Sequence, residues 1–304
     1  MNRVIRAIFD PKRIIRFLVS KNYLPMKDDN YLRLSFLCSM GYKLDLSNPV
    51  TFNEKLQWLK LYDRKEIYTS MVDKFEAKNF IGTLVGKQYV IPTLGIYNNF
   101  DEINFDNLPN QFVIKCTHDS GGLVVVKDKS HFNKKNAKKV INKSLKVNYF
   151  YPGREWPYKN IKPRIIVEKY MEDEKTHELR DYKFFCFNGK VKIFKIDYDR
   201  MIDHHANYYD KSGNLIHCGE ILCPPDYNRN IDLPVNLKKM IKFAEILSAN
   251  IPFLRVDFYE IDSKIYVGEL TFYPASGFGK FTDSSFDYEL GNFLDLGLVM
   301  NNEK

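Results

Sequence analysis

The sequence predicts an α+β fold with a helical N-terminal region. Helical periodicity dominates residues 28–80, and strands joined by tight turns dominate residues 112–272. These strands do not alternate regularly with helices, as they would in a doubly wound parallel sheet. With 304 residues, 44% of them hydrophobic, the chain is long enough for about two domains with large cores.

The N-terminal segment is basic and amphipathic. Residues 1–21 carry six basic side chains against Asp10 alone, interleaved with apolar residues such as Ile8 and Leu18. Pro11 is expected to break or restart the helix here. A helix of this kind either docks on the body of the protein or lies on a membrane surface through residues 1–20, and both interpretations stay open.

Two further helices are expected before the first strands. Thr51 or Asn53 is suited to cap a helix that runs through Leu61, and a second helix is predicted over residues 66–81. The polar stretch 98–110 then marks a boundary near residues 90–110.

The remaining elements are mainly hairpins. Asn188-Gly189 is a strong signal for a two-residue type I′ turn in a hairpin over residues 181–198. Strands are expected over 112–116, 124–126 and 164–170, a second long hairpin over 253–272, and helices over 133–148 and 235–249.

The charge and cysteine content of the chain indicate which kind of partner it binds and in which compartment it is found. Lys and Arg exceed Asp and Glu by 46 − 38 = 8, which favours an anionic partner. The five cysteines contain no CxxC pair, and no apolar run approaches the ~20 residues of a membrane-spanning helix. No signal-peptide pattern and no nucleic-acid-binding module is recognisable, so a reduced cytoplasmic protein that does not bind nucleic acid is expected.

The hairpin over residues 253–272 is the most informative segment. If it turns about Ser263, Asp257 lies six residues before the turn and Glu269 six after it, directly opposite each other on one face. Arg255 and Thr271 share that face. Two carboxylates this close repel unless a cation lies between them, so the pattern predicts either a Mg²⁺ site or pairing of Asp257 with Arg255 or a lysine.

Two other segments carry weaker signals. Lys115 ends a strand and is followed by the turn Ser120-Gly121-Gly122, which lets backbone N–H groups approach a phosphate; an ordinary glycine hairpin is the alternative. Downstream, Asp181 and Lys183 share one face of a strand. The pair Asp197 and Asp199 has the D-x-D form used by many glycosyltransferases to hold a metal.

Together these segments resemble one family. The motifs are PVTFNEKLQW at 49–58, FVIKCTHDSGG at 112–122, DYKFFCFNG at 181–189, and RVD at 255–257 with GELT at 268–271. Their order resembles the ATP-grasp superfamily, and more closely the TupA-like ATP-grasp proteins of bacterial surface-polysaccharide gene clusters. The resemblance covers about residues 31–296. It implies an ATP-grasp fold, in which two α+β lobes enclose ATP.

The resemblance also implies residue roles. It implies that Lys115, Ser120, Gly121 and Gly122 contact the phosphates, that Glu168, Lys169 and Met171 line the adenine, and that Asp181 and Lys183 bind ribose and phosphate. Asp257 and Glu269 match the Mg²⁺ ligands, and Arg255 and Lys183 the catalytic cations. Thr271 stands where many ATP-grasp ligases have Asn, which puts a second metal ion in doubt.

The function implied is an ATP- and Mg²⁺-dependent carboxylate–amine ligase that works through an acyl phosphate. The expected partners are a uronic acid of a capsule or O-antigen precursor and an amine or amino acid. Alternatives are a glycosyltransferase using Asp197 and Asp199, a kinase built on the same ATP site, and a nucleotide-binding module without catalysis. The expected division is a helical region over 1–95, a small lobe with the phosphate flap over 96–165, and a large lobe with the metal-binding hairpin over 166–304.

Overall fold

The computed structural model describes residues 11–173, 179–200 and 202–300. Its helices are α2 (Pro11–Ser20), α3 (Asp28–Met40), α4 (Phe52–Tyr62), α5 (Glu66–Val72), α6 (Glu76–Leu84), α7 (Lys134–Ser144), α8 (Phe150–Gly153), α9 (Leu237–Leu247), α10 (Ser285–Phe293) and α11 (Gly297–Met300). Its strands are β1 (Thr93–Tyr97), β2 (Phe112–Cys116), β3 (Leu123–Val126), β4 (Ile165–Lys169), β5 (Asp181–Phe187), β6 (Lys190–Tyr198), β7 (His205–Asp210), β8 (Leu215–Ile216), β9 (Phe253–Ile261) and β10 (Lys264–Thr271).

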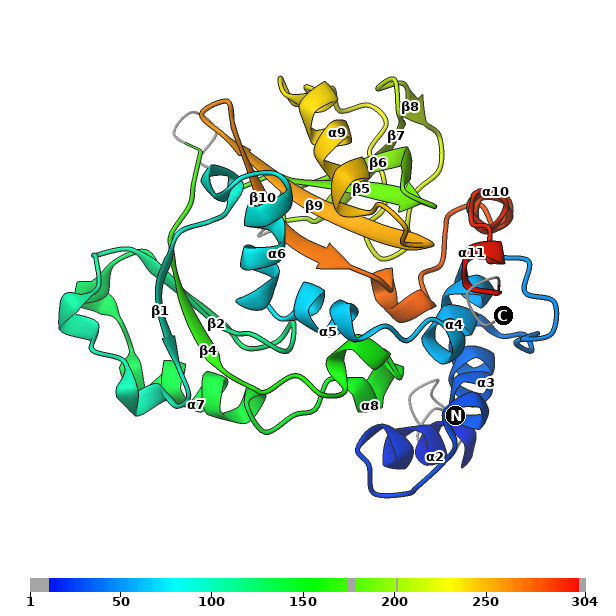
Figure 1. The fold of residues 1–304 in the computed structure, drawn as a ribbon, viewed down its shortest axis with the longest axis horizontal. Helices are drawn as coiled ribbons and strands as arrows, with labels where there is room; N and C mark the ends of the chain where they lie inside the picture. The colour runs from blue at the N-terminus through cyan, green and yellow to red at the C-terminus, as the bar shows by residue number, and fades with distance from the viewer. Residues whose placement is uncertain (1–10, 174–178, 201, 301–304) are drawn as a thin grey trace.

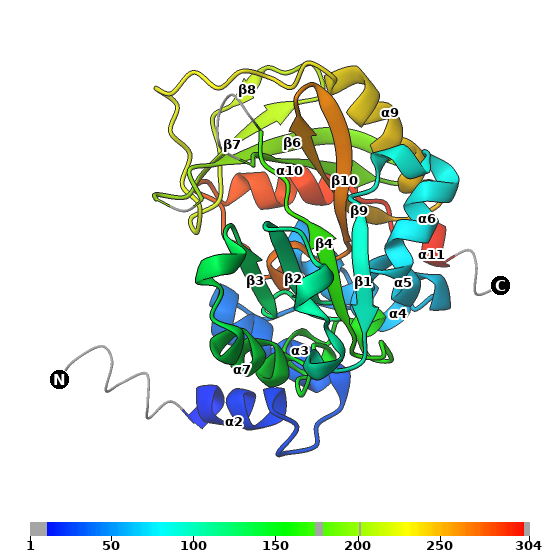
Figure 2. The ribbon, with the colours of Figure 1, turned by 90° about the vertical axis from the view of Figure 1, so that its left-hand side faces the viewer.

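The strands form two separate sheets. The smaller sheet has the order β1-β4-β2-β3 and the larger one the order β10-β9-β5-β6-β7-β8. All pairings between these described strands are antiparallel. Figure 1 shows the two sheets on either side of α5 and α6, and Figure 2 shows them one above the other. The predicted α+β class is therefore confirmed.

Each sheet has its own hydrophobic core. The smaller sheet packs on α7 and on Phe100 and Phe105. The core of the larger sheet includes residues of α3 to α6 and α9. Phe52 of α4, for example, packs on Phe253 with ring centroids 4.9 Å apart. The N-terminal helices thus share a core with the larger sheet.

The division of the chain therefore differs from the expected one in two respects. Residues 1–95 were expected to form a region of their own, whereas the described helices of this region are part of the core of the larger sheet. The expected boundary between residues 165 and 166 falls inside β4, which pairs with both β1 and β2. The chain passes from one sheet to the other after Lys169.

The helix expected over residues 66–81 is two helices. Asp73 Oδ1 accepts hydrogen bonds from the backbone N–H groups of Phe75, at 2.8 Å, and Glu76, at 3.0 Å. An Asp side chain that bonds to the following backbone in this way favours a helix start, so α5 ends and α6 begins at this point. The predicted cap at Thr51 is confirmed, because Thr51 and Glu54 form a capping box at the start of α4.

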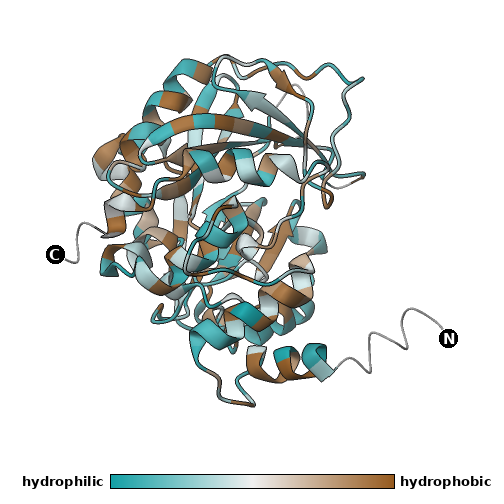
Figure 3. Cartoon of the chain, turned by 90° about the vertical axis from the view of Figure 1, so that its right-hand side faces the viewer, coloured by the Kyte–Doolittle hydropathy of each residue, from teal (hydrophilic) through white to brown (hydrophobic). Residues whose placement is uncertain are grey.

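The amphipathic N-terminal segment is described only from Pro11, where α2 begins, and residues 1–10 lie outside the described range. Val19 of α2 is buried, whereas Ile14 and Phe17 are 46% and 56% exposed. Figure 3, coloured by hydropathy, shows the helix next to the N-terminus, α2, at the edge of the molecule with apolar and polar segments. Among the described residues, no helix combines the length and apolar character that a membrane span requires.

Candidate active site

The hairpin β9–β10 carries the two predicted metal ligands. Its turn is tighter than expected: Asp262 and Ser263 both have left-handed backbone angles, and Ile261 pairs with Lys264 rather than with Ile265. A β-bulge between Val267 and Glu269 then shifts the register by one residue. Asp257 consequently pairs with Glu269, as the sequence predicted, although it reaches this register through a bulge.

Gly268 makes this bulge possible. A Cβ at this position would lie 2.8 Å from the ring of Tyr259, which is closer than real Cβ contacts. The glycine therefore lets the strand shift its register against a half-buried aromatic residue.

The carboxylates are held by Arg255. Its Nε and Nη2 donate to the two oxygens of Asp257, each at 2.6 Å, and Nη2 also lies 3.1 Å from Glu269 Oε1 and 3.2 Å from Thr271 Oγ1. The side chain of Asp257 is 3% exposed and that of Glu269 is 49% exposed. Glu269 thus presents this cluster to the space between the sheets.

The same cluster shifts the pKa of both carboxyl groups. Burial raises the pKa of Asp257 to about 7, although Arg255 opposes this shift. Desolvation raises the pKa of Glu269. The charges of Arg255 and Lys74 lower it by more, so the pKa falls below its usual value. Glu269 is therefore an anion at neutral pH.

Charged residues continue across the larger sheet in one row. Cross-strand pairing places Glu269 next to Asp257, Asp257 next to Lys183, and Lys183 next to Lys195. Lys183 forms an ion pair with Asp197 and lies 3.8 Å from Asp181 Oδ2. The predicted residues Asp181, Lys183, Asp257 and Glu269 thus share one face of the sheet.

Asp181 and the D-x-D pair are each matched by cations. Asp181 pairs with Arg200, and Asp199 pairs with Arg229. Asp197 is 1% exposed and is surrounded by Lys183, Lys195 and His204. Asp197 and Asp199 therefore have separate partners and do not form a shared carboxylate pair.

Three further lysines lie on other elements: Lys115 on β2, Lys78 on α6, and Lys74 in the turn between α5 and α6. Lys115 Nζ lies 2.7 Å from Glu168 Oε2, and Lys78 pairs with the other oxygen of Glu168. Lys74 donates to the carbonyl oxygen of Asp119, and its charge acts on Glu269. Lys74 and Lys78 were missed from sequence, because the expected continuous helix gave no reason to direct them toward the sheets.

Ser120, Gly121 and Gly122 form the flap between β2 and β3. Ser120 Oγ lies 2.9 Å from Tyr149 Oη, and the N–H of Gly122 donates to Asp119 Oδ1 at 3.2 Å. A Cβ on Gly122 would lie 2.5 Å from Cys116 Sγ, so only glycine fits there.

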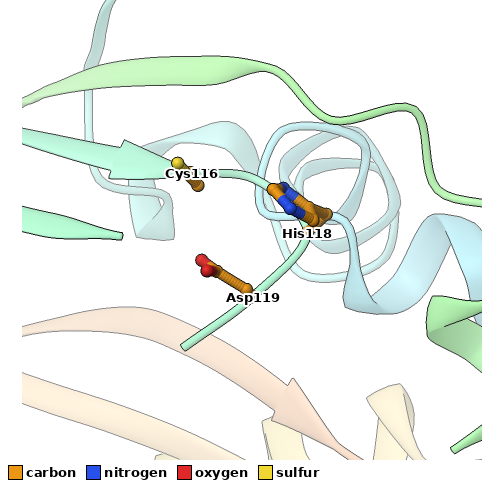
Figure 4. A group of neighbouring side chains, drawn as sticks. All are labelled: Cys116, His118 and Asp119. Atoms are coloured by element: carbon orange, nitrogen blue, oxygen red, sulfur yellow. The ribbon is translucent and has the colours of Figure 1, made fainter. Parts of the chain in front are cut away.

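Cys116, His118 and Asp119 lie together at the base of the flap, as Figure 4 shows, with their ligand-type atoms within 4.8 Å of one another. Burial raises the pKa of Cys116 to about 12, which keeps its thiol protonated. His118 Nε2 faces the carbonyls of Ser144, at 3.3 Å, and Val147, at 3.0 Å, and Asp119 accepts from Ser144. We assign these three residues to anchoring the flap on α7.

A cleft of about 420 Å³ lies beside the end of β4. It is lined by Gln111, residues 169–173, and Ile261, Asp262, Lys264 and Tyr266 of the β9–β10 hairpin. The predicted adenine residues Lys169 and Met171 therefore line this cleft. Glu168 does not belong to its lining, and its side chain instead pairs with Lys115 and Lys78.

The residues present suit a Mg²⁺ ion. Asp257, Glu269 and Thr271 offer only oxygen atoms, which are the ligands that Mg²⁺ prefers, and the side chain of Glu269 is half-exposed. Bound there, the metal ion would neutralise phosphate charge.

Two antiparallel sheets that face each other across this arrangement of lysines and carboxylates define a protein of the ATP-grasp class. More specifically, the chain belongs to the TupA-like ATP-grasp family, whose family model matches residues 54–295.

Solved structures with a similar fold are distant in sequence. D-alanine–D-alanine ligase from Bacillus anthracis is 17% identical with a TM-score of 0.42, over 76% of this chain and 69% of that one. The corresponding ligase from Helicobacter pylori is 16% identical with a TM-score of 0.43, over 80% and 69%. Phosphoribosylamine–glycine ligase from Thermotoga maritima is 14% identical with a TM-score of 0.40, over 68% and 49%. No curated protein sequence matches the chain.

Proposed function

We propose that the protein is an ATP- and Mg²⁺-dependent ligase that joins a carboxylate to an amine through an acyl phosphate. One observation carries the proposal: Glu269 lies opposite Asp257 and contacts Arg255, and the charges of Lys74 and Lys183 act on it as well. Converging cations beside paired carboxylates suit a nucleoside triphosphate with its metal ion. The family to which the chain belongs supports this proposal.

Each part of the site would have its own role in binding ATP or in the reaction. The cleft beside β4 would take the adenine against Lys169 and Met171, while Lys115 and the flap would hold the phosphates. Asp257 and Glu269 would hold Mg²⁺. Arg255 and Lys183 would stabilise charge on the phosphoryl group as it passes to the substrate carboxylate.

We propose that the acid is a uronic acid of a capsule or O-antigen precursor, and that the amine is an amino acid or a related amine. Hydroxylamine distinguishes this ligase from a kinase at the same site. It attacks an acyl phosphate to give a hydroxamate, whereas a phosphate ester formed by a kinase does not react in this way. We expect hydroxamate and ADP when the protein is given ATP·Mg²⁺, hydroxylamine and glucuronate or galacturonate. A stable phosphorylated sugar without hydroxamate would support the kinase.

Nucleotide binding can be tested separately. ATP·Mg²⁺ should raise the melting temperature, because a ligand that binds only the folded state stabilises it by RT ln(1 + [L]/Kd). Lys115→Met should reduce this shift, while Lys135→Met on the exposed face of α7 should leave it unchanged. A shift with a UDP-sugar but none with ATP would favour the glycosyltransferase instead.

We also propose that α2 contacts an anionic membrane surface through Ile14 and Phe17, which would place the protein at the inner face of the membrane. The double variant Ile14→Glu/Phe17→Glu should lose at least about tenfold in affinity for phosphatidylglycerol vesicles, because both apolar side chains would have to leave the bilayer. Val235→Glu, at a position 82% exposed, is the matched control. Equal sedimentation of both variants with the vesicles would rule out this contact.

A further inference from the structure

A second cavity, of about 300 Å³, lies between α2, α3, α8 and the short helix η6 (Pro274–Gly277). We call it the serine-rich cavity, since Ser20, Ser35, Ser39 and Ser276 all line it. Its volume is at the lower end of the range of about 300–1,000 Å³ typical of small-molecule sites. None of the residues assigned above to ATP or to the metal lines it.

Neither charged residue of the cavity forms a direct ion pair with another described residue. Glu155 is 6% exposed; the charge of the buried Lys60 acts on it, but no ion-pair contact joins the two side chains. Arg16 donates to Ser39 Oγ at 2.9 Å and likewise meets no carboxylate in the described part of the chain. An acidic and a basic side chain that face one cavity without a direct ion pair make its lining complementary to a ligand that carries both a cation and an anion.

An unpartnered hydroxyl adds to this evidence. Ser35 is 2% exposed, and its Oγ has no hydrogen-bond partner among the described residues. Buried polar groups are normally paired, so such a group in a cavity wall indicates a missing ligand or water.

The cavity adjoins the phosphate side of the active site. Tyr149 lines it and contacts Ser120 of the flap at 2.9 Å. The charges of Glu155 and Glu269 both act on Tyr149. η6 begins three residues after Thr271, and Figure 1 shows this turn above α8. Tyr149 therefore connects the cavity to the flap, and the charges of both carboxylates reach it.

The part of the cavity wall formed by η6 and Gly153 is tightly packed. Ala275 and Ser276 have left-handed backbone angles of φ 48° and 53°. A Cβ on Gly153 would collide with Ser276 Oγ and lie 2.9 Å from Glu155 Oε1. Lys60 Nζ, which is fully buried, holds the carbonyl oxygen of Ser276 at 2.8 Å. Strained, tightly packed backbone of this kind is found where a fold must hold functional groups in place.

We propose that the serine-rich cavity binds the amine substrate, a small molecule with a primary amine that faces Glu155 and an anionic group that faces Arg16. This assignment rests on the proposed ligase function. It names the chemical class of the amine as a zwitterion, such as an amino acid, and assigns its recognition to two residues.

Glu155 also has a chemical role in this assignment. Its carboxylate takes one proton from the substrate ammonium, which gives a neutral amine. The nitrogen lone pair attacks the carbonyl carbon of the acyl phosphate, the C–N bond forms, and the C–O bond to phosphate breaks. Phosphate leaves with that electron pair and the second proton, and the amide remains.

The test uses the full chain with ATP·Mg²⁺ and either glucuronate or galacturonate as the acid. Two nucleophiles then compete for the activated acid: hydroxylamine, and an L-amino acid or the corresponding decarboxylated amine. Hydroxamate formation reports activation of the acid alone. Glu155→Gln should lower amide formation about 10²-fold or more and leave hydroxamate formation within twofold. Arg16→Met should raise KM about tenfold or more for the amino acid, but change it little for the decarboxylated amine. Arg13→Met, on the same helix but outside the cavity lining, is the control.

Each outcome is decisive. If wild type makes no hydroxamate, the proposed ligase function is wrong and this assignment falls with it. If wild type makes hydroxamate but no amino acid competes, or if both variants match wild type in amide formation, only the assignment of the cavity is wrong.

Discussion

Asp257→Asn and Glu269→Gln should each lower ATP-dependent turnover by on the order of 10²–10³-fold or more, because each removes an anionic ligand from the pair that would hold Mg²⁺. The stability of the two variants should differ. Glu269 is half-exposed and repels Asp257, so its loss should leave the free energy of unfolding near that of wild type. Asp257→Asn weakens a buried bidentate pair with Arg255 and should cost about 1.5–3 kcal/mol.

The measurements are ADP release, with acid and amine present, and urea denaturation. Glu289→Gln, at an exposed position on α10, is the matched loss of one negative charge and should change neither quantity. Near-full activity in either site variant would show that the metal assignment is wrong, and with it most of the mechanism.

Arg255→Ala should have the largest effect on stability, about 3–5 kcal/mol, because it leaves Asp257 buried beside Glu269 without its cation. Adding Asp257→Asn to this variant should restore most of the stability, since the uncompensated charge is then gone. Turnover should fall in both variants, and it should fall more than nucleotide affinity, because Arg255 faces the transferred phosphoryl group in the proposed mechanism.

Denaturation of the two variants, together with nucleotide titration, checks this prediction. Arg229→Ala provides a comparison, because Arg229 pairs with Asp199 at a site where its side chain is 42% exposed, and such surface pairs contribute about 0–1 kcal/mol. If Arg255→Ala and Arg229→Ala cost the same, or if the double variant is no more stable than Arg255→Ala, the buried pair does not control stability as described.

Several elements could be predicted because their signals are local. Asn188-Gly189 occupies the turn between β5 and β6 with both residues in the left-handed region, as the dipeptide indicated. Thr51 and Glu54 form the expected capping box. Where the local signal was ambiguous, the prediction failed: residues 66–81 have helical periodicity throughout, but the side chain of Asp73 divides them into α5 and α6.

The sequence by itself predicted that Asp257 lies opposite Glu269, because the register of a hairpin depends on residues close together in the chain. The register is reached in another way than expected: the two-residue turn alone would pair Asp257 with Gly268, and the bulge between Val267 and Glu269 moves the pairing by one residue. It also placed Lys183 and Asp181 on one face of their strand. Only the tertiary structure decided that the charge of Lys74 acts on Glu269, and that Glu168 pairs with Lys115 and Lys78. The same holds for Glu155 and Arg16, which line one cavity. These contacts join residues on separate elements, and their positions depend on how the helices pack against the two sheets rather than on any periodicity along the chain.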